Sequence, residues 1–558
     1  MTSLFCHMSD SRYSQLMMRV PIFIALAICT GIFIGAKMFG SQSVSSTGDV
    51  VNNSNKLREI LNYIDKYYVD SANTNELTDY AIKRMLEKLD PHTIYIPAKD
   101  MKIMGNQLKS HFEGIGIQFT ILRDTLQVEL PITGGPAETA GIRAGDKIVY
   151  VNGERIAGIG LTNRMVYDKL LGKKGSKVHL TIVRKGIKDT LSYTLIRDKI
   201  PQYSVETAYM IADKTGYIRL SRFGENAYDE FKAALEKLIS QGMTRLIFDL
   251  RGNSGGYMDR AVKIADELIG GDKLLVYTDG RDNSQDEQFY AYRDGLFEKG
   301  ALILLINEES ASASEIVAGA LQDNDRALIV GRRSFGKGLV QRPITLSDGS
   351  ELRLTVSRYY TPSGRSIQKP YEDGKIEQYV DDFSRRLAHG ELFVADSNRF
   401  DEKLKYKTKL GRTVYGGGGI MPDVFVPSDT SYQTPYLNSI LSANLHREFT
   451  SGYLANYQAN WKGKPMSFFI SHFSLPEAML QSIVEAASKE KIQFNVAQWN
   501  KSKKYLTTLL KALIARGLYG EEGFYTIMNN QDKVVQKALN LFDLATKIEK
   551  GITNTDTP

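Results

Sequence analysis

Two short segments of the sequence place a serine and a lysine in surroundings that suit nucleophilic chemistry. The first is residues 310–315, Ser-Ala-Ser-Ala-Ser-Glu, which follows the apolar run 302–306 and precedes a helical pattern. Its small residues let a substrate backbone approach, and a helix N-terminus there supplies free N–H groups and positive potential where an oxyanion forms. Ser312 and Glu315 also match the S-x-x-E capping box, a structural role that explains the segment equally well.

The second segment holds Lys337 in a glycine-rich stretch between strand-like runs, with Gln341 four residues later. Glycines let the backbone pass close to other groups and place the lysine on a constrained loop. A lysine is a general base toward serine only when neutral, so its ordinary pKa of about 10.4 must be lowered by burial or by nearby positive charges. Because most lysines are solvated surface residues, the residue types alone leave both interpretations open.

The same glycine-rich stretch nearly matches a phosphate-binding loop. Residues 331–338 fit G-x-x-x-x-G-K-[ST] except at the last position, where Gly338 lacks the hydroxyl that would hold Mg²⁺. Residues 339–341, Leu-Val-Gln, predict a strand where a phosphate loop requires a helix. A nucleotide-dependent machine is therefore a weak alternative.

A third pattern, G-x-S-x-G at residues 252–256, would make Ser254 a nucleophile on a strand-to-helix turn. That chemistry usually needs a histidine base oriented by a carboxylate. None of the seven histidines lies in the surrounding glycine-rich stretches, and each, including His92, is interpreted as structural. Ser254 is thus a weaker candidate than Ser312.

Buried strands must position these segments. The continuous apolar runs 246–250, 274–277, 302–306 and 327–330 are typical of strands covered on both faces of an α/β sheet. Helical periodicity predicts two amphipathic helices within residues 57–89 and dominates the tail from Thr430 onward, as in Val534, Ala538 and Phe542.

Between residues 113 and 198 the sequence changes to short strands separated by glycines. Residues 135–142, Gly-Pro-Ala-Glu-Thr-Ala-Gly-Ile, followed by residues 144–153 with the pattern GD.I..VNG, resemble the PDZ domain. In that family the loop matching residues 113–116 offers backbone N–H groups to a peptide's terminal carboxylate, and the peptide adds a strand to the sheet edge. The resemblance implies a peptide-binding loop at Gly114, Ile115, Gly116 and Ile117; an edge hairpin without a ligand is the alternative.

Composition limits the class of protein and its location. The 558 residues, with 42% hydrophobic and 24% charged residues, describe an ordinary multi-domain globular chain, and a net charge of +7 without a dense basic block predicts no nucleic-acid partner. Cys6 and Cys29 leave the chain after residue 30 without a disulfide or a thiolate metal site. The uncharged run Val20–Ala36, preceded by Arg12 and Arg19, predicts an uncleaved single-pass signal anchor in the inner (cytoplasmic) membrane, with later residues facing the periplasm or the cell exterior. A signal peptide that is removed is the alternative.

Six segments in order resemble the motifs of the C-terminal processing (tail-specific) serine peptidases, over roughly residues 55–430. They are residues 89–97 (Leu-Asp-Pro-His-Thr-Ile-Tyr-Ile-Pro), 249–256 (Asp-Leu-Arg-Gly-Asn-Ser-Gly-Gly), 310–323, 335–341, 359–368 and 419–423. The resemblance implies a serine endopeptidase that requires no metal or cofactor. It also implies substrates with apolar, unstructured C-termini, which the PDZ domain binds.

The site residues follow from the same resemblance. It implies Ser312 as nucleophile, Lys337 as general base 25 residues later, and Gln341 as the group that orients the lysine. The backbone N–H of Ala313, with one from either Gly255 or Gly256, is expected to form the oxyanion hole.

The predicted architecture is α/β and multi-domain. It consists of a cytoplasmic stub and membrane anchor (1–40), a tether and helical segment (41–112), a PDZ domain (113–198), a crotonase-like α/β peptidase core (199–430) and a helical C-terminal domain (431–558). The alternative from another class is a PDZ scaffold that binds tails without cutting them. The helical segments at both ends leave a homo-oligomer or an adaptor protein open, and residues 431–558 carry no chemical motif.

Overall fold

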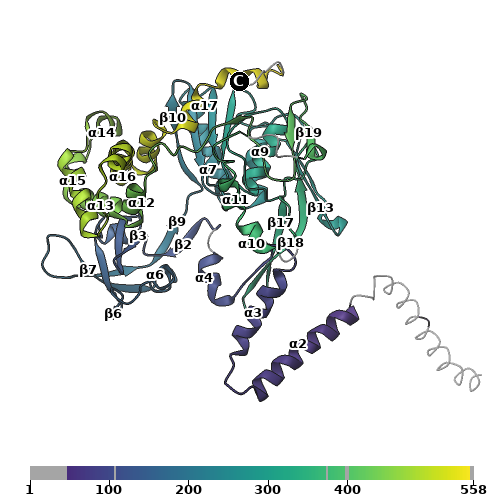
Figure 1. The fold of residues 1–558 in the computed structure, drawn as a ribbon, viewed down its shortest axis with the longest axis horizontal. Helices are drawn as coiled ribbons and strands as arrows, with labels where there is room; N and C mark the ends of the chain where they lie inside the picture. Colours follow the sequence, from purple (N-terminus) through teal and green to yellow (C-terminus); the bar gives the residue numbers. More distant parts are fainter. Residues whose placement is uncertain (1–29, 31–46, 106–107, 373–374, 396–400, 553–558) are drawn as a thin grey trace, which may run out of the picture. The chain divides into compact units, whose positions relative to one another are not determined.

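The computed structural model describes residue 30 and residues 47–105, 108–372, 375–395 and 401–552 (Figure 1). The chain divides into two compact units, Met1–Arg84 and Met85–Pro558. The predicted helical segment forms α2 (Thr47–Tyr67) and α3 (Thr74–Leu86), and α3 ends where the second unit begins. The first unit therefore consists, in its described part, of two helices joined by a short turn.

The predicted anchor, Val20–Ala36, lies outside the described residues apart from Thr30. Among the residues that the structure describes, no helix has the length and apolar character needed to cross a membrane.

A six-stranded sheet forms the core of the second unit, in the order β10-β11-β12-β15-β16-β21. All neighbouring pairs from β11 onward are parallel, whereas β10 and β11 are antiparallel. Three of the four predicted apolar runs lie in β12, β15 and β16. The strands are β10 (Val205–Ala212), β11 (Thr215–Leu220), β12 (Arg245–Asp249), β15 (Leu302–Ile306), β16 (Leu328–Gly331) and β21 (Val424–Phe425).

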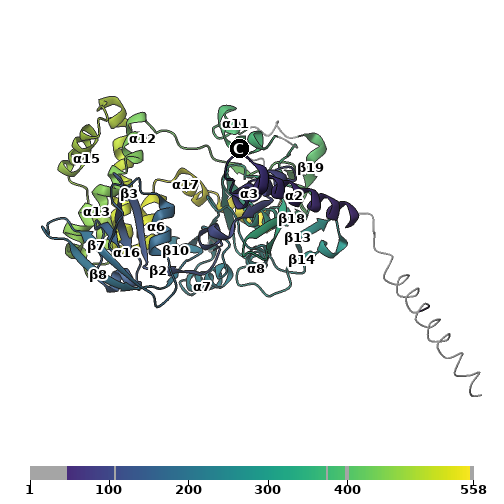
Figure 2. The same ribbon diagram turned by 90° about the horizontal axis from the view of Figure 1, so that it is seen from below.

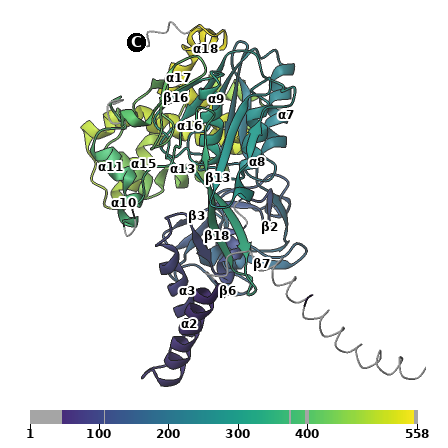
Figure 3. The same ribbon diagram turned by 90° about the vertical axis from the view of Figure 1, so that its right-hand side faces the viewer.

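Helices cover both faces of this sheet (Figure 3). The helices α7 (Ala227–Ser240), α8 (Met258–Asp266) and α9 (Ala313–Asp323) pack on the face that includes Leu302 and Leu304. The C-terminal helices α17 (Lys533–Leu539) and α18 (Phe542–Glu549) pack on the opposite face, against Ile303 and Leu305. Alternate residues of β15 thus enter two separate hydrophobic clusters, which explains its unbroken apolar run.

The prediction for residues 274–277 is wrong in one respect. This run forms β13 (Leu274–Gly280), which belongs to a second, antiparallel sheet and not to the parallel one. Four apolar residues cannot specify a strand's partners, because pairing is decided by long-range contacts. The sheet has the order β1-β18-β13-β14 with β17 beside β18; its other strands are β1 (Ile94–Ile96), β14 (Gln288–Tyr290), β17 (Leu339–Thr345) and β18 (Glu351–Tyr360).

A small β module is inserted ahead of this core. The strands that enter and leave it, β2 (His111–Gly114) and β9 (Asp198–Pro201), pair antiparallel. Its sheet has the order β3-β4-β5-β7-β8, with β3 (Ile117–Leu122) at one edge. Its remaining elements are β4 (Thr125–Pro131), β5 (Lys147–Val151), β6 (Glu154–Arg155), β7 (Lys177–Val183), β8 (Leu191–Ile196), α5 (Pro136–Thr139) and α6 (Asn163–Leu170).

The helices between residues 435 and 529 lie beside this module in both views (Figure 1 and Figure 2). Arg123 of the module forms ion pairs with Glu448 at 3.2 Å and with Glu490 at 2.7 Å. Ala144 of the module packs into the same hydrophobic cluster as Leu454. These helices are α12 (Pro435–Ser442), α13 (Leu445–Tyr457), α14 (Met466–His472), α15 (Glu477–Lys489) and α16 (Val496–Asn529).

The remaining described elements are short. They are η1 (Ala98–Asp100), α4 (Met101–Met104), η2 (Asn283–Gln285), α10 (Ile376–Val380), α11 (Asp382–Ala388), η4 (Glu402–Leu404), β19 (Lys405–Lys407), β20 (Thr413–Tyr415) and η5 (Gln458–Trp461).

Candidate active site

Ser312 is the residue that caps the N-terminus of α9, directly after the segment that follows β15. Its backbone has φ 56° and ψ −114°, a conformation that L-residues rarely adopt. Such a conformation costs about 1–3 kcal/mol and persists only where surrounding contacts hold it. Gly255 lies against it so closely that an added Cβ would be 2.8 Å from Ser312 Cβ, which explains the glycine at that position.

Lys337 lies in the loop between β16 and β17 and is mostly buried. Burial is the main cause that lowers the pKa of its amine, and the positive charge of Arg353 acts in the same direction. Its Nζ donates to Gln341 Oε1 at 2.9 Å, and Gln341 Nε2 in turn donates to the carbonyl oxygen of His92. Gln341 is therefore fixed in the orientation that presents its oxygen to the lysine.

The Glu315 carboxylate joins the serine segment to the lysine loop. Oε2 accepts the backbone N–H of Ser312 at 2.8 Å and that of Lys337 at 2.9 Å. Oε1 accepts the Ser334 hydroxyl at 2.6 Å and the Gly336 N–H at 2.7 Å. Complete burial raises the pKa of Glu315 to about 7, against the opposing effect of these four hydrogen bonds. Sequence reasoning identified Glu315 only as half of a capping box.

Tyr359 makes a second link between the two segments. Its hydroxyl lies 3.0 Å from the carbonyl oxygen of Ser312 and within hydrogen-bond distance of the Lys337 carbonyl. The side chain is buried at 1% exposure, so the link is shielded from water.

Ser312 and Lys337 line one cavity of about 380 Å³, together with Gln341. The described residues that line it include no histidine. Much of the wall is apolar, from the side chains of Met104, Leu108, Met258, Ile316, Leu339 and Val340. A neutral lysine beside a serine in an apolar cavity can accept the hydroxyl proton and generate a nucleophile.

The backbone groups predicted for the oxyanion hole also meet at this cavity. The N–H of Gly255 donates to Asn253 Oδ1 at 2.9 Å and is therefore engaged within its own loop. Among the described residues, the N–H groups of Gly256 and Ala313 have no hydrogen-bond partner. Of the two predicted alternatives, the geometry favours Gly256 with Ala313.

The predicted peptide-binding loop lies in the β module, apart from this cavity. Gly114 ends β2, Ile117 begins β3, and Ile115 is buried in the module's core at 2% exposure. Gly116 has φ +75°, and an added Cβ would lie 2.9 Å from the Ile200 side chain. The loop therefore leads directly into the edge strand to which a peptide strand could be added.

Several residues that contact the site could not be distinguished from structural residues by the sequence pattern. His92 contributes its backbone carbonyl, and its ring Nε2 lies 2.7 Å from the Tyr379 hydroxyl. Gln368 Oε1 accepts the Gly338 N–H at 2.8 Å, next to Lys337. The only available signal for these residues was their position within segments 89–97 and 359–368.

The alternative candidates lack the required surroundings. Ser254 is exposed and lines the same cavity as Lys337, but the hydrogen bonds of Glu315 and Tyr359 tie Ser312, not Ser254, to the lysine loop, and no described histidine lines that cavity. Residues 339–345 form strand β17, so the phosphate-loop pattern is not followed by a helix.

Comparisons with known proteins agree on a family. Peptidase family S41 matches residues 214–377, the PDZ domain matches residues 127–184, and a family of unknown function, DUF8443, matches residues 436–520. The carboxy-terminal-processing protease of Bartonella bacilliformis is 36% identical over 357 residues, which is 63% of this chain and 80% of the relative. The carboxy-terminal processing protease CtpA of Bacillus subtilis is 32% identical, over 67% of this chain and 79% of the relative.

Among solved structures, the photosystem II D1 C-terminal processing protease is 30% identical. The match covers 67% of this chain and 86% of that chain, with a TM-score of 0.35. On the sequence comparisons with the curated relatives, this chain belongs to the PDZ-containing carboxy-terminal processing proteases of peptidase family S41 and is a serine-type peptidase.

Proposed function

We propose that this protein is an endopeptidase with a Ser312–Lys337 dyad that cleaves proteins selected by their C-terminal tails. One observation carries the proposal: Ser312 and Lys337 line the same cavity, and a single carboxylate oxygen of Glu315 holds the backbone of both. No cofactor or metal is needed for this chemistry, because the lysine supplies the base and backbone N–H groups supply the oxyanion hole.

The reaction proceeds through an acyl-enzyme. Neutral Lys337 accepts the Ser312 hydroxyl proton while Oγ attacks the peptide carbonyl carbon, and the N–H groups of Ala313 and Gly256 stabilise the oxyanion. The intermediate collapses, the peptide C–N bond breaks, and the amine leaves with the proton held by Lys337. Water, activated by the same lysine, then attacks the ester and releases the acid. Each oxyanion donor contributes about 3 kcal/mol to the transition state.

The β module is proposed to select the substrate. The edge strand β3 lies across from α6, where Phe119 and Tyr167 are in edge contact with ring centroids 5.8 Å apart. A peptide that adds a strand to β3 places its terminal carboxylate near the loop Gly114–Ile117. Apolar side chains on both elements favour tails with apolar residues.

The apolar run Val20–Ala36 and the preceding Arg12 and Arg19 support a further proposal, that the protein is anchored in the inner membrane. The catalytic unit then faces the periplasm or the cell exterior. Protease added outside intact spheroplasts tests this: an anchored protein with this orientation loses its C-terminal epitope, and a protected epitope contradicts the proposal.

The activity is tested with the purified protein and an unfolded substrate that ends in an apolar tail. We expect the wild type to cut, and Ser312→Ala and Lys337→Ala to bind the tail without cutting it. A fluorescent peptide with the same tail measures binding in parallel. If all three proteins bind the tail and none cuts, the alternative of a non-catalytic PDZ scaffold is favoured instead.

A further inference from the structure

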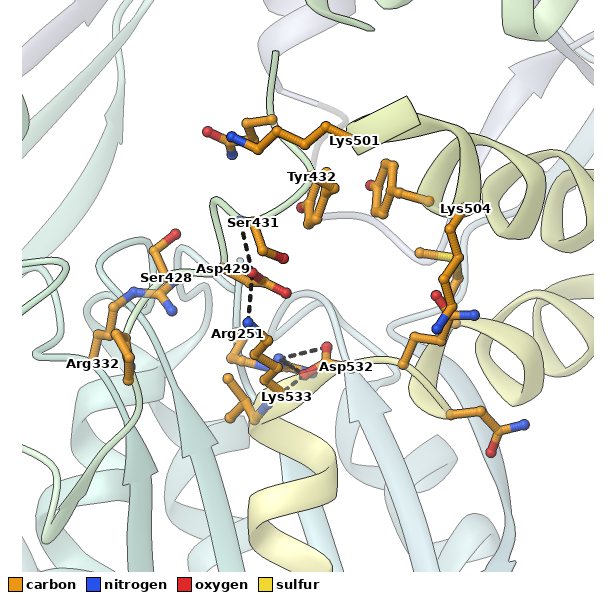
Figure 4. A pocket seen from close by; sticks show the side chains of 17 residues that line it. Arg251, Arg332, Ser428, Asp429, Ser431, Tyr432, Lys501, Lys504, Asp532 and Lys533 are labelled. Carbon is orange, nitrogen blue, oxygen red and sulfur yellow. Dashed lines mark hydrogen bonds and ion pairs between the residues drawn. The ribbon is translucent and has the colours of Figure 1, made fainter. Parts of the chain in front are cut away.

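A second and larger cavity lies at the carboxyl ends of three parallel strands. Its volume is about 640 Å³, within the range of small-molecule sites. Arg251 follows β12, Arg332 follows β16 and Ser428 follows β21, and helix α16 closes the opposite side (Figure 4). In open α/β sheets, this end of the strands is where ligands usually bind. The cavity is lined by residues other than Ser312 and Lys337 and forms a separate site.

The lining carries more positive than negative charge. Five cationic side chains face two carboxylates, Asp429 and Asp532, a difference of three; the cations are Arg251, Arg332, Lys501, Lys504 and Lys533. Three of the five have carboxylate partners. Arg251 pairs with Asp532 at 2.9 Å and Lys533 with Asp429 at 2.8 Å, and Arg332 pairs with Glu308 at 2.7 Å.

The remaining two cations, Lys501 and Lys504, have no ion-pair or hydrogen-bond partner among the described residues. They lie one turn apart on α16, where like charges repel and destabilise the helix. Their neighbour Lys503 lies on the same helix but outside the cavity, and its charge is balanced by Glu477 at 2.8 Å. Of these three neighbouring lysines, the two without a partner are therefore the two that line the cavity.

The other residues of the lining lie around these two lysines. Figure 4 shows Lys501 and Lys504 on the α16 side, with Arg251 and Asp532 across the cavity from them. The stacked rings of Tyr432 and Tyr505, with centroids 3.7 Å apart, form a rigid wall between the helix and the loop after β21. Ser428, Ser431 and the Asn530 side chain line the same space, whereas the backbone N–H groups of Asn530 and Gln531 already donate to the Met528 carbonyl oxygen.

We propose that this cavity binds a small multivalent oxyanion, held by Lys501 and Lys504. Positive charge in a concave site concentrates anions more strongly than the same charge on a flat surface. Lysine binds phosphate or carboxylate oxygens as a point charge, and the hydroxyls of Ser428 and Ser431, which line the cavity, can donate further hydrogen bonds. The two lining carboxylates, already paired, disfavour a long polyanion such as nucleic acid and leave room for a compact ligand.

Calorimetric titration of the full-length protein tests this proposal, with sodium pyrophosphate and sodium citrate as separate probes at constant ionic strength. The double variant Lys501→Gln/Lys504→Gln removes both unpaired charges, and Lys503→Gln is the matched control from the same helical turn. Lys501 and Lys504 are exposed and Lys503 is half-buried, so the variants are expected to fold, which circular dichroism checks.

We expect at least one probe to bind the wild type with a Kd of about 1 mM or tighter. The double variant should bind at least about tenfold more weakly, and Lys503→Gln within about twofold of the wild type. Binding of pyrophosphate alone identifies a phosphate site, and binding of citrate alone identifies a carboxylate site. Failure of both probes up to about 10 mM, or equal binding by the double variant and the wild type, overturns the proposal.

Discussion

The backbone N–H groups of Ser312 and Lys337 donate to the same oxygen atom, Oε2 of Glu315, at 2.8 and 2.9 Å. The two residues are 25 positions apart in the sequence, one on a helix N-terminus and the other on a glycine-rich loop. One buried carboxylate therefore helps to fix their relative position, together with the Tyr359 hydroxyl. Because both oxygens of this carboxylate only accept hydrogen bonds, a side chain with an N–H₂ group cannot replace it without loss.

Glu315→Gln is accordingly expected to lower kcat by about 100-fold or more and to destabilise the fold by about 1–3 kcal/mol. In the variant, an amide N–H₂ group replaces one carboxylate oxygen. The two groups that donate to that oxygen in the wild type would lose their acceptor and face another donor instead. Steady-state kinetics and thermal unfolding measure the two effects. Glu309→Gln, an exposed position in the same segment, is the control and should retain wild-type values. Full activity of Glu315→Gln would contradict the linking role.

Activity is expected to rise with pH and to reach half its maximum below pH 10.5, because burial lowers the pKa of Lys337 and only the neutral amine is a base. The kcat/KM profile measures this midpoint. Lys337→Arg, which stays protonated, should be inactive at every pH. A profile that does not respond to pH between 6 and 10 would contradict the assignment of Lys337 as the base.

The same shift affects stability with a definite sign. Between the lowered pKa in the folded protein and the ordinary value of 10.5, the unfolded chain binds more protons at this lysine. The free energy of unfolding is therefore expected to increase with pH across that range relative to Lys337→Met, which has no titrating group there. Denaturant unfolding of both proteins at several pH values gives the difference.

Asn253→Ala is expected to lower kcat by about 10- to 100-fold with little change in KM. The Asn253 side chain accepts the Gly255 N–H at 2.9 Å and donates to the Leu220 carbonyl at 2.9 Å, so it fixes the loop that carries Gly256. Affinity for a peptide aldehyde, which forms an oxyanion at the site, should fall in parallel with kcat.

Substitution of Ser254, the exposed neighbour of Asn253, tests directly whether this serine is the nucleophile. Ser254→Ala should keep at least about half of the wild-type kcat, because Ser254, although it lines the same cavity as Lys337, is not joined to the lysine loop through Glu315 and Tyr359 as Ser312 is. Complete loss of activity in Ser254→Ala together with activity in Ser312→Ala would reverse the assignment.

Asp532 links the C-terminal helix α17 to the core sheet, and this link is expected to stabilise the fold. Its carboxylate pairs with Arg251 at 2.9 Å and accepts the N–H groups of Val534 and Val535, at the start of the helix that covers the sheet. Asp532→Ala is expected to destabilise the protein by about 2 kcal/mol, and Asp532→Asn, which keeps the cap, by about 1 kcal/mol. Chemical denaturation measures both, and equal stability of the two variants would exclude the cap contribution.

The sequence by itself determined the family, the candidate nucleophile and base, and most of the strands. These features are local: six short motifs, and apolar runs such as 302–306 whose length and composition suit a strand buried on both faces. The helical periodicity of Val534, Ala538 and Phe542 likewise predicted helices in the tail, although it did not predict that α17 and α18 pack on the sheet of the peptidase core.

Only the tertiary structure decided how distant segments meet. The carbonyl of His92 accepts a hydrogen bond from Gln341, 249 residues later, and no local pattern specifies that contact. The choice of Gly256 over Gly255 depends on which N–H the Asn253 side chain engages, and β13 joined an antiparallel sheet that its apolar run did not indicate. Motifs fix which residue types are available, whereas long-range hydrogen bonding and packing determine which of their atoms are free to act.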